Sequence, residues 1–140
     1  MPEEIATQLK QSTDYAIRIV MYLAEKQQIA NSEEISTQMC IPQSVVATLA
    51  MPLQKAGILT TLRGVGGGFA LSRRPEDISL HEIINLMEGT TRINCCLESE
   101  DACSRNATAI CKVHKFYLQE QAKLDKSFQE MTIARLLRDE

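Results

Sequence analysis

Four glycines within five residues, "GVGGG" at 64–68, constrain the fold of this chain more than any other feature. They lie between two short β-type segments, "ILTTLR" and "GFALS". Because glycine tolerates the positive φ angles of a tight turn, the pattern predicts a β-hairpin. A glycine turn alone is weak evidence of function. No G-K-[ST] follows the glycines, which excludes a phosphate-binding P-loop.

Three helices are predicted before the hairpin. Residues 12–26 place apolar side chains at helical spacing, and Ser12 or Thr13 can cap the segment. Residues 31–40 form a second, short helix, and a third begins near Pro42, where the first-turn preference for proline applies. The hairpin therefore follows a pair of helices joined by a short connection.

The third helix contains one conflict with ordinary helix chemistry. Pro52 lies inside it and predicts a kink or an early end to its regular part, with Gly57 as the C-cap. Beyond the hairpin, Ser79 and Glu82 form a capping box, and Gly89 closes that helix. A polar loop without periodicity follows, and a last helical pattern runs from Ala109 to about Glu130, with Ile110, Val113, Tyr117, Leu124, Phe128 and Met131 on one stripe.

This order of elements, two helices and then a glycine-tipped hairpin, is typical of a winged helix-turn-helix, in which the second helix enters the major groove of DNA. The net charge is -3, so a basic surface for DNA must be local. Residues 55–74 hold four basic residues and no acidic one. The candidate DNA contacts are Gln43, Ser44, Thr48, Arg63, Gly66, Gly67, Gly68 and, near the first helix, Lys10.

Four of the five cysteines lie in residues 95–111. No C-x-x-C pair occurs, which argues against a zinc ribbon and a thioredoxin-type redox pair. Three widely spaced thiolates suit an iron–sulfur cluster, whereas the alternatives are incidental thiols or a thiol redox switch. Cys111 and His114 are three residues apart and share one helical face. We expect the fifth cysteine, Cys40, to be a buried core thiol.

Other function classes are disfavoured by the sequence. The N-terminus lacks the features of a signal peptide and no stretch is long enough to span a membrane, so we expect a cytoplasmic protein without disulfides. A cysteine enzyme is disfavoured because His81 and His114 are the only histidine bases and no nucleophile motif surrounds any cysteine.

Three motifs together resemble the IscR/NsrR/RirA superfamily of bacterial winged-helix regulators, over residues 9 to about 137. The first is "TDYAIRIVMYLA" at 13–24, and the second is the wing "LRGVGGGFALSR" at 62–73. The third is the set of three cysteines, Cys96, Cys103 and Cys111, before the long last helix. The resemblance implies a homodimer, paired through its long C-terminal helices, that binds a double-stranded DNA operator and an iron–sulfur cluster.

Transferred residue by residue, the resemblance makes Cys96, Cys103 and Cys111 the thiolate ligands. The fourth ligand is either Asp14 of the partner subunit, which we favour, or His114. The resemblance favours 4Fe–4S over 2Fe–2S. The cysteine spacings are longer than is usual in the family.

Two further departures concern individual residues. Cys95 is a possible substitute for Cys96 as a ligand. Ala47 replaces a glutamate that one branch of the family uses to read bases, which leaves the DNA sequence preference open.

The predicted fold is mainly α with a small β-hairpin wing. We expect a DNA-binding domain at 1–78, and a cluster-binding loop (90–111) with a dimerisation helix at 79–140. The predicted function is a transcriptional regulator, a repressor, whose cluster senses nitric oxide, redox state or iron and Fe–S status. The alternative is a cluster-free thiol-based redox regulator of the same fold.

Overall fold

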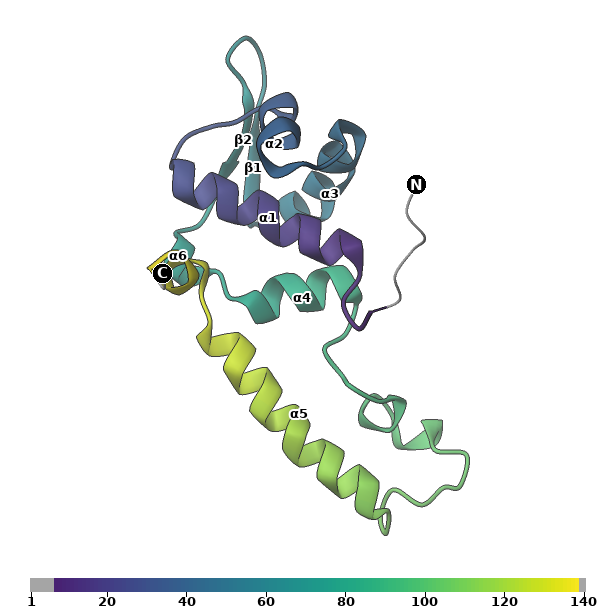
Figure 1. The fold of residues 1–140 in the computed structure, drawn as a ribbon. Coiled ribbons are helices and arrows are strands. Elements are labelled where there is room, and N and C mark those ends of the chain that lie inside the picture. Colours follow the sequence, from purple (N-terminus) through teal and green to yellow (C-terminus); the bar gives the residue numbers. More distant parts are fainter. Residues whose placement is uncertain (1–6, 139–140) are drawn as a thin grey trace.

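Helices make up most of the computed structural model, which describes residues 7–138. A helical head and its hairpin stand at one end, and one long helix and an irregular loop extend away from it together (Figure 1). This confirms the predicted mainly α class with a two-stranded wing. The helices are α1 (Gln11–Lys26), α2 (Ser32–Met39), α3 (Gln43–Lys55), α4 (Leu80–Glu88), α5 (Lys112–Glu130) and α6 (Ile133–Arg138), and the strands are β1 (Leu59–Leu62) and β2 (Gly68–Leu71).

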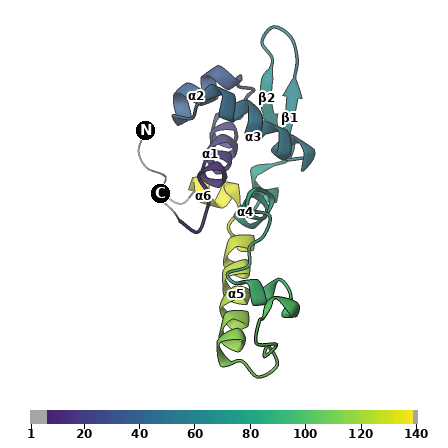
Figure 2. The same cartoon turned by 90° about the vertical axis from the view of Figure 1, so that its right-hand side faces the viewer.

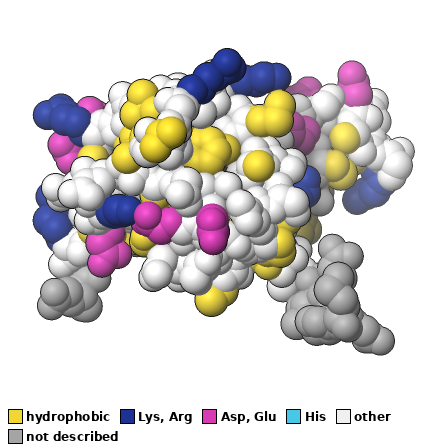
Figure 3. All heavy atoms as spheres, turned by 90° about the horizontal axis from the view of Figure 1, so that it is seen from above, with side chains coloured by type: hydrophobic (Ala, Val, Ile, Leu, Met, Phe, Trp, Pro, Cys, Tyr) yellow, Lys and Arg dark blue, Asp and Glu magenta, His cyan; other side chains and the backbone are white. Residues whose placement is uncertain are grey.

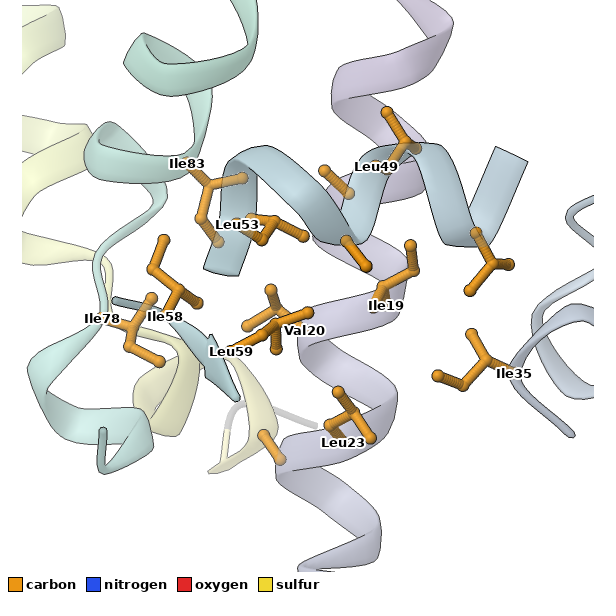
Figure 4. Packing of buried hydrophobic residues seen from close by; sticks show 14 of the residues in the cluster. Ile19, Val20, Leu23, Ile35, Leu49, Leu53, Ile58, Leu59, Ile78 and Ile83 are labelled. Carbon is orange, nitrogen blue, oxygen red and sulfur yellow. The ribbon is translucent and has the colours of Figure 1, made fainter. Parts of the chain in front are cut away.

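The hydrophobic core lies in the head, where α1 is the central element. Its Ile19 and Val20 are fully buried, and Leu53 of α3 packs in the same cluster (Figure 4). The core also takes in Ile83 of α4 and Ile133 of α6. Each such side chain contributes about 1.5–3 kcal/mol on burial, so the head has its own source of stability.

A helix-turn-helix is formed by α2 and α3. The prediction that Cys40 is a buried core thiol is wrong, because its side chain is exposed. Cys40 is the C-cap of α2 and adopts the left-handed conformation, with φ 56°. The buried position in this turn belongs to the next residue, Ile41, which is 2% exposed. Cys40 therefore lies on the surface between the two helices of the helix-turn-helix.

The third helix does not end early at its proline. It continues through Pro52 to Lys55, because a proline this close to the end removes a single late hydrogen bond. Gly57 follows with φ +78° and donates its N–H to the carbonyl of Gln54. Ile58 donates to the carbonyl of Leu53, which completes a Schellman motif. The predicted glycine stop is confirmed one residue beyond the C-cap, which is Ala56.

The wing is an antiparallel hairpin in which Leu59 pairs with Leu71 and Leu62 pairs with Gly68. The hairpin projects from the head beyond α2 and α3 (Figures 1 and 2). Phe69 of β2 also exchanges two backbone hydrogen bonds with Ala30, at 2.8 and 3.0 Å. The wing is therefore tied to the segment that enters α2.

The first and fourth helices are joined at one end by a carboxylate. The prediction that Ser12 or Thr13 caps α1 is wrong, because the N-cap is Lys10 and makes no side-chain cap bond. The N–H of Lys10 instead donates to a carboxylate oxygen of Glu88 at 2.8 Å, and the buried Thr13 hydroxyl donates to the same oxygen. Glu88 is the last residue of α4, just before the cysteine loop. The start of α1 is therefore capped by a residue that is distant in the sequence and not by a neighbouring one.

The predicted capping box of α4 is confirmed, since Ser79 accepts the N–H of Glu82 at 3.2 Å and Gly89 closes the helix. The last long helix, α5, begins at Lys112 rather than Ala109. The short helix α6 follows it; its Ile133 donates to the carbonyl of Ile78 and returns the chain to the head. No helix within residues 7–138 is long and apolar enough to cross a membrane.

Candidate cysteine site and DNA-binding surface

The four clustered cysteines line one hollow of about 240 Å³ between the loop and the start of α5. Cys95 and Cys96 belong to a short 3-10 turn at Cys95–Leu97, and Cys103 follows a second turn at Glu100–Ala102. Cys111 is the N-cap of α5, and His114 lines the same hollow. Residues that are up to nineteen positions apart are therefore brought to one place, as the sequence predicts.

Two of the sulfur atoms accept hydrogen bonds from nearby N–H groups. Cys111 Sγ accepts the backbone N–H of His114 at 3.4 Å. Cys96 Sγ accepts a hydrogen bond from Nδ2 of the Asn94 side chain at 3.3 Å. Cys95, in contrast, is exposed. Hydrogen bonds to a ligating sulfur tune the potential of the cluster that it holds.

The surroundings of Cys103 lower the pKa of its thiol. Hydrogen bonds from the backbone of Ala107 and then Arg105 lower the pKa of the Cys103 thiol, and they outweigh the opposing effect of desolvation. The positive charge of Arg105 acts in the same direction. The loop is therefore folded to stabilise a thiolate at this position, which suits either a metal ligand or a redox-active thiol.

The chemistry of the donor set suits an iron–sulfur cluster, because three of the residues that line the hollow are Cys96, Cys103 and Cys111. Among residues 7–138, no three His, Cys, Asp or Glu side chains converge on the position of one ion. A cluster spreads its thiolate ligands over several iron atoms, and soft sulfur donors favour it. In addition, His114 Nδ1 is buried and finds no hydrogen-bond partner in the described chain, so one nitrogen donor is free beside the thiols.

Asp14 is separate from this hollow within one protomer. It lies in the first turn of α1, with its side chain 57% exposed, and pairs with Arg18 at 2.7 Å. The Arg18 guanidinium also donates to the backbone carbonyl of Met39 at 3.1 Å. Asp14 is thus an accessible carboxylate that is linked, through one arginine, to the last residue of α2.

Most of the predicted DNA-contact residues lie on α3 and the wing, but Lys10 does not. It is the N-cap of α1, and its N–H is bonded to Glu88 at the end of α4. Gln43, Ser44 and Thr48 are exposed on the first turns of α3, and Arg63 is exposed on the wing. Gln43 also donates to the hydroxyl of Ser32 at 3.2 Å, so it spans the two helices. Seen from the wing end, cationic and anionic side chains both surround the surface (Figure 3).

The wing glycines have a role inside the protein. A Cβ on Gly68 would lie 2.4 Å from the carbonyl oxygen of Ala30, and one on Gly67 would lie 2.2 Å from that of Leu62. Gly66 has φ +79° with open space around it. Contact of these glycines with DNA stays a prediction, whereas their tight packing is a property of the fold.

One polar cluster was not predicted. Gln121 and Asp125 of α5 bind the backbone and side chains of residues 91–93, where the cysteine loop begins. The available signal in the sequence is a glutamine on the stripe that otherwise holds Tyr117, Leu124 and Phe128.

The fold and the exposed helix pair define the class of a winged helix-turn-helix protein. A model of the Rrf2 family, described as an iron-dependent transcriptional regulator, matches residues 9–139. The chain therefore belongs to the Rrf2 family. It is a DNA-binding transcriptional regulator and not an enzyme.

Individual relatives agree with this family. The HTH-type transcriptional regulator NsrR of Halalkalibacterium halodurans is 24% identical over 136 residues, which cover 95% of this chain and 92% of the relative. CymR (YrzC), the global cysteine regulator of B. subtilis, has a TM-score of 0.78 at 19% identity and covers 94% of this chain and 96% of its own. T. potens IscR has a TM-score of 0.75 at 19% identity, with 96% and 88% covered. The two structures show a shared fold.

Proposed function

We propose that this chain is a cytoplasmic, homodimeric repressor whose affinity for a double-stranded DNA operator is set by an iron–sulfur cluster. The observation that carries the proposal is the hollow lined by Cys96, Cys103 and Cys111, in which each sulfur has N–H donors nearby. When bound, the cluster supplies sensitivity to nitric oxide, redox state or iron and Fe–S status. A 4Fe–4S cluster is favoured over 2Fe–2S.

The fourth ligand that we favour is Asp14 of the partner subunit. Its carboxylate is exposed and pairs with Arg18, so it is accessible to a second chain. The competing candidate is His114, because its Nδ1 is buried and unpartnered at the edge of the hollow. A hard carboxylate is the weaker ligand for iron in a thiolate-rich site and would leave more readily.

Asp14 also connects the proposed cluster with the helix-turn-helix. Arg18 bridges the Asp14 carboxylate and the carbonyl of Met39, which ends α2. A change in the partner of Asp14 therefore alters an arginine that contacts the helix-turn-helix directly. Loss of the cluster would shift the two heads, so that their recognition helices no longer match half-sites about 34–36 Å apart.

The α5 helix supports pairing of two copies. Val113 and Phe116 are 54% and 55% exposed, and they are neighbours on one helix face because they are three residues apart. Exposed apolar side chains that are grouped in this way on a helix are typical of an interface. The same end of α5 carries Cys111, so pairing there would bring the partner close to the cysteine hollow.

The central test is anaerobic purification, followed by iron and sulfide analysis and operator binding with and without the cluster. We expect wild-type protein to contain both elements and the Cys96→Ala, Cys103→Ala, Cys111→Ala triple variant to contain neither. Asp14→Ala and His114→Ala, compared by absorption and Mössbauer spectroscopy, identify the fourth ligand. Wild-type protein that contains no iron after anaerobic purification would rule out the proposal.

The second candidate function is a cluster-free thiol redox regulator. It is favoured by the lowered pKa of Cys103, since a stabilised thiolate is also the more readily oxidised form. Cys95 and Cys96 lie on the same hollow and are available as resolving thiols. A reversible disulfide that changes operator affinity, found by mass spectrometry in colourless protein, would support this function over the first.

A further inference from the structure

The most buried side chain of α5 is a glutamine. Gln121 is 5% exposed, and it is the only buried residue of α5. Burying an amide is unfavourable unless its polar atoms are paired, and here all of them are engaged. Its Oε1 accepts the N–H of Ile93 at 2.8 Å, and its Nε2 donates to the carbonyl of Thr91 at 2.8 Å.

The two bonds go to backbone groups of residues that are two positions apart. The Gln121 side-chain amide therefore binds the 91–93 segment at both of its ends. It therefore fixes both the distance and the register between α5 and the start of the cysteine loop.

Asp125, one turn further along α5, extends the contact. Its carboxylate accepts hydrogen bonds from Nε2 of Gln121 at 2.9 Å and from the hydroxyl of Thr91 at 3.1 Å. It also forms an ion pair with Arg92 at 2.8 Å. His81 of α4 lies 3.5 Å from the same carboxylate. The Asp125 side chain is 20% exposed, so these contacts are only partly screened by solvent.

We propose that Gln121 and Asp125 are positioning residues that couple the cysteine loop to the DNA-binding head. They hold residues 91–93, which end three positions before Cys96, against α5, the helix that begins after Cys111. Asp125 also contacts His81, which belongs to α4. This inference rests on the proposed cluster-dependent function. Without the clasp formed by Gln121 and Asp125, Cys96 would keep its thiol but lose its fixed position relative to Cys111 and to the head.

The test compares Gln121→Leu, which keeps the side-chain volume, with Gln119→Leu, a matched change at an exposed glutamine of the same helix. Operator affinity is measured for each protein with and without the cluster. We expect the ratio of the two affinities in Gln121→Leu to fall by about fivefold or more, within the usual range of coupling between sites, and in Gln119→Leu to match wild type.

A second readout reports on the clasp itself. In cluster-free protein, hydrogen exchange at the Ile93 amide should be slow in wild type and Gln119→Leu, and fast in Gln121→Leu, because Oε1 of Gln121 is its acceptor. Asp125→Asn should give a smaller change, since it keeps an oxygen acceptor but loses the charge. Rapid exchange with an unchanged affinity ratio would overturn the coupling role.

The wild-type protein and Gln121→Leu together separate the role of the clasp from cluster-dependent DNA binding. If wild-type protein binds no cluster, the proposed function fails and the coupling role fails with it. If wild-type protein binds a cluster that changes operator affinity, and Gln121→Leu responds as wild type does, only the clasp is overturned. Slow exchange at Ile93 in Gln121→Leu would likewise exclude it.

Discussion

The sulfur of Cys111 accepts the backbone N–H of His114 at 3.4 Å, so a proposed cluster ligand is also the N-cap of the long helix α5. The two roles are separable because serine caps a helix well and binds iron–sulfur clusters poorly. The same residue therefore links the state of the hollow to the first turn of the helix on which dimerisation is proposed.

The first prediction separates these roles of Cys111. In cluster-free protein, Cys111→Ser should be more stable than Cys111→Ala by about 1 kcal/mol, since serine keeps the cap and alanine removes it. Urea unfolding followed by circular dichroism measures the difference. Both variants should contain less iron than wild type after anaerobic purification. Equal stability of the two variants would show that the cap contributes nothing.

The second prediction concerns the adjacent pair Cys95 and Cys96. Cys96 accepts a hydrogen bond from Asn94, whereas Cys95 is exposed. We expect Cys95→Ala to keep the wild-type iron and sulfide content and Cys96→Ala to lose most of it. The reverse result would show that Cys95 is the ligand. Retention in both single variants, with loss in the double variant, would show that either thiol suffices.

The hairpin tip yields a third prediction, about stability. Gly68→Ala should destabilise the protein by about 1–3 kcal/mol, because the new Cβ would overlap the carbonyl oxygen of Ala30. Gly66→Ala, which meets open space at φ +79°, should cost about 1 kcal/mol from backbone strain alone. Thermal or urea unfolding compares them. A smaller loss in Gly68→Ala than in Gly66→Ala would contradict the packing role.

The outcome for the fold shows which features were predictable from sequence. The Ser79–Glu82 box and Gly57 are local signals, because each acts on backbone within a few residues. Glu88 and Gln121 were missed for the opposite reason. Glu88 supplies the cap that Ser12 or Thr13 was expected to give, and it comes from α4, a distant part of the chain.

The candidate site follows the same division. The grouping of the cysteines is visible in the sequence, but the N–H donors around them depend on the loop conformation. Cys40 was misassigned because a cysteine is usually buried, whereas the left-handed turn gives the interior position to Ile41. The residues that distinguish Cys96 from Cys95 are not evident without the structure.

A fourth prediction tests the interface proposed on α5. Phe116→Lys places a charge among exposed apolar side chains, so it should convert a dimer to a monomer and weaken operator binding, which needs two recognition helices. Sedimentation analysis gives the mass in solution. Lys126→Ala, at an exposed polar position of the same helix, is the control and should remain dimeric. A dimeric Phe116→Lys protein would place the interface elsewhere.

The last prediction uses the lowered pKa of the Cys103 thiol. Because the backbone N–H groups of Ala107 and Arg105 stabilise its thiolate, the reactive form should appear at a lower pH than that of an ordinary cysteine, about 8.5. In cluster-free protein, the alkylation rate of Cys103 should therefore reach half of its maximum at a lower pH than in urea-unfolded protein, and it should fall as the solution is made more acidic. Mass spectrometry of iodoacetamide-treated protein follows each cysteine separately.

The control for this measurement is a change to the loop that supplies the donors. Ala107→Pro removes the N–H that contributes most to lowering the Cys103 pKa. The midpoint of Cys103 alkylation should then move to higher pH, while the exposed Cys95 reports any general change in reagent access. If the midpoint of Cys103 in the folded, unsubstituted protein is no lower than in the urea-unfolded protein, its backbone donors do not stabilise the thiolate in solution. The thiol redox function would then lose the observation that favours it. Cluster binding is tested separately, by the iron content of the protein.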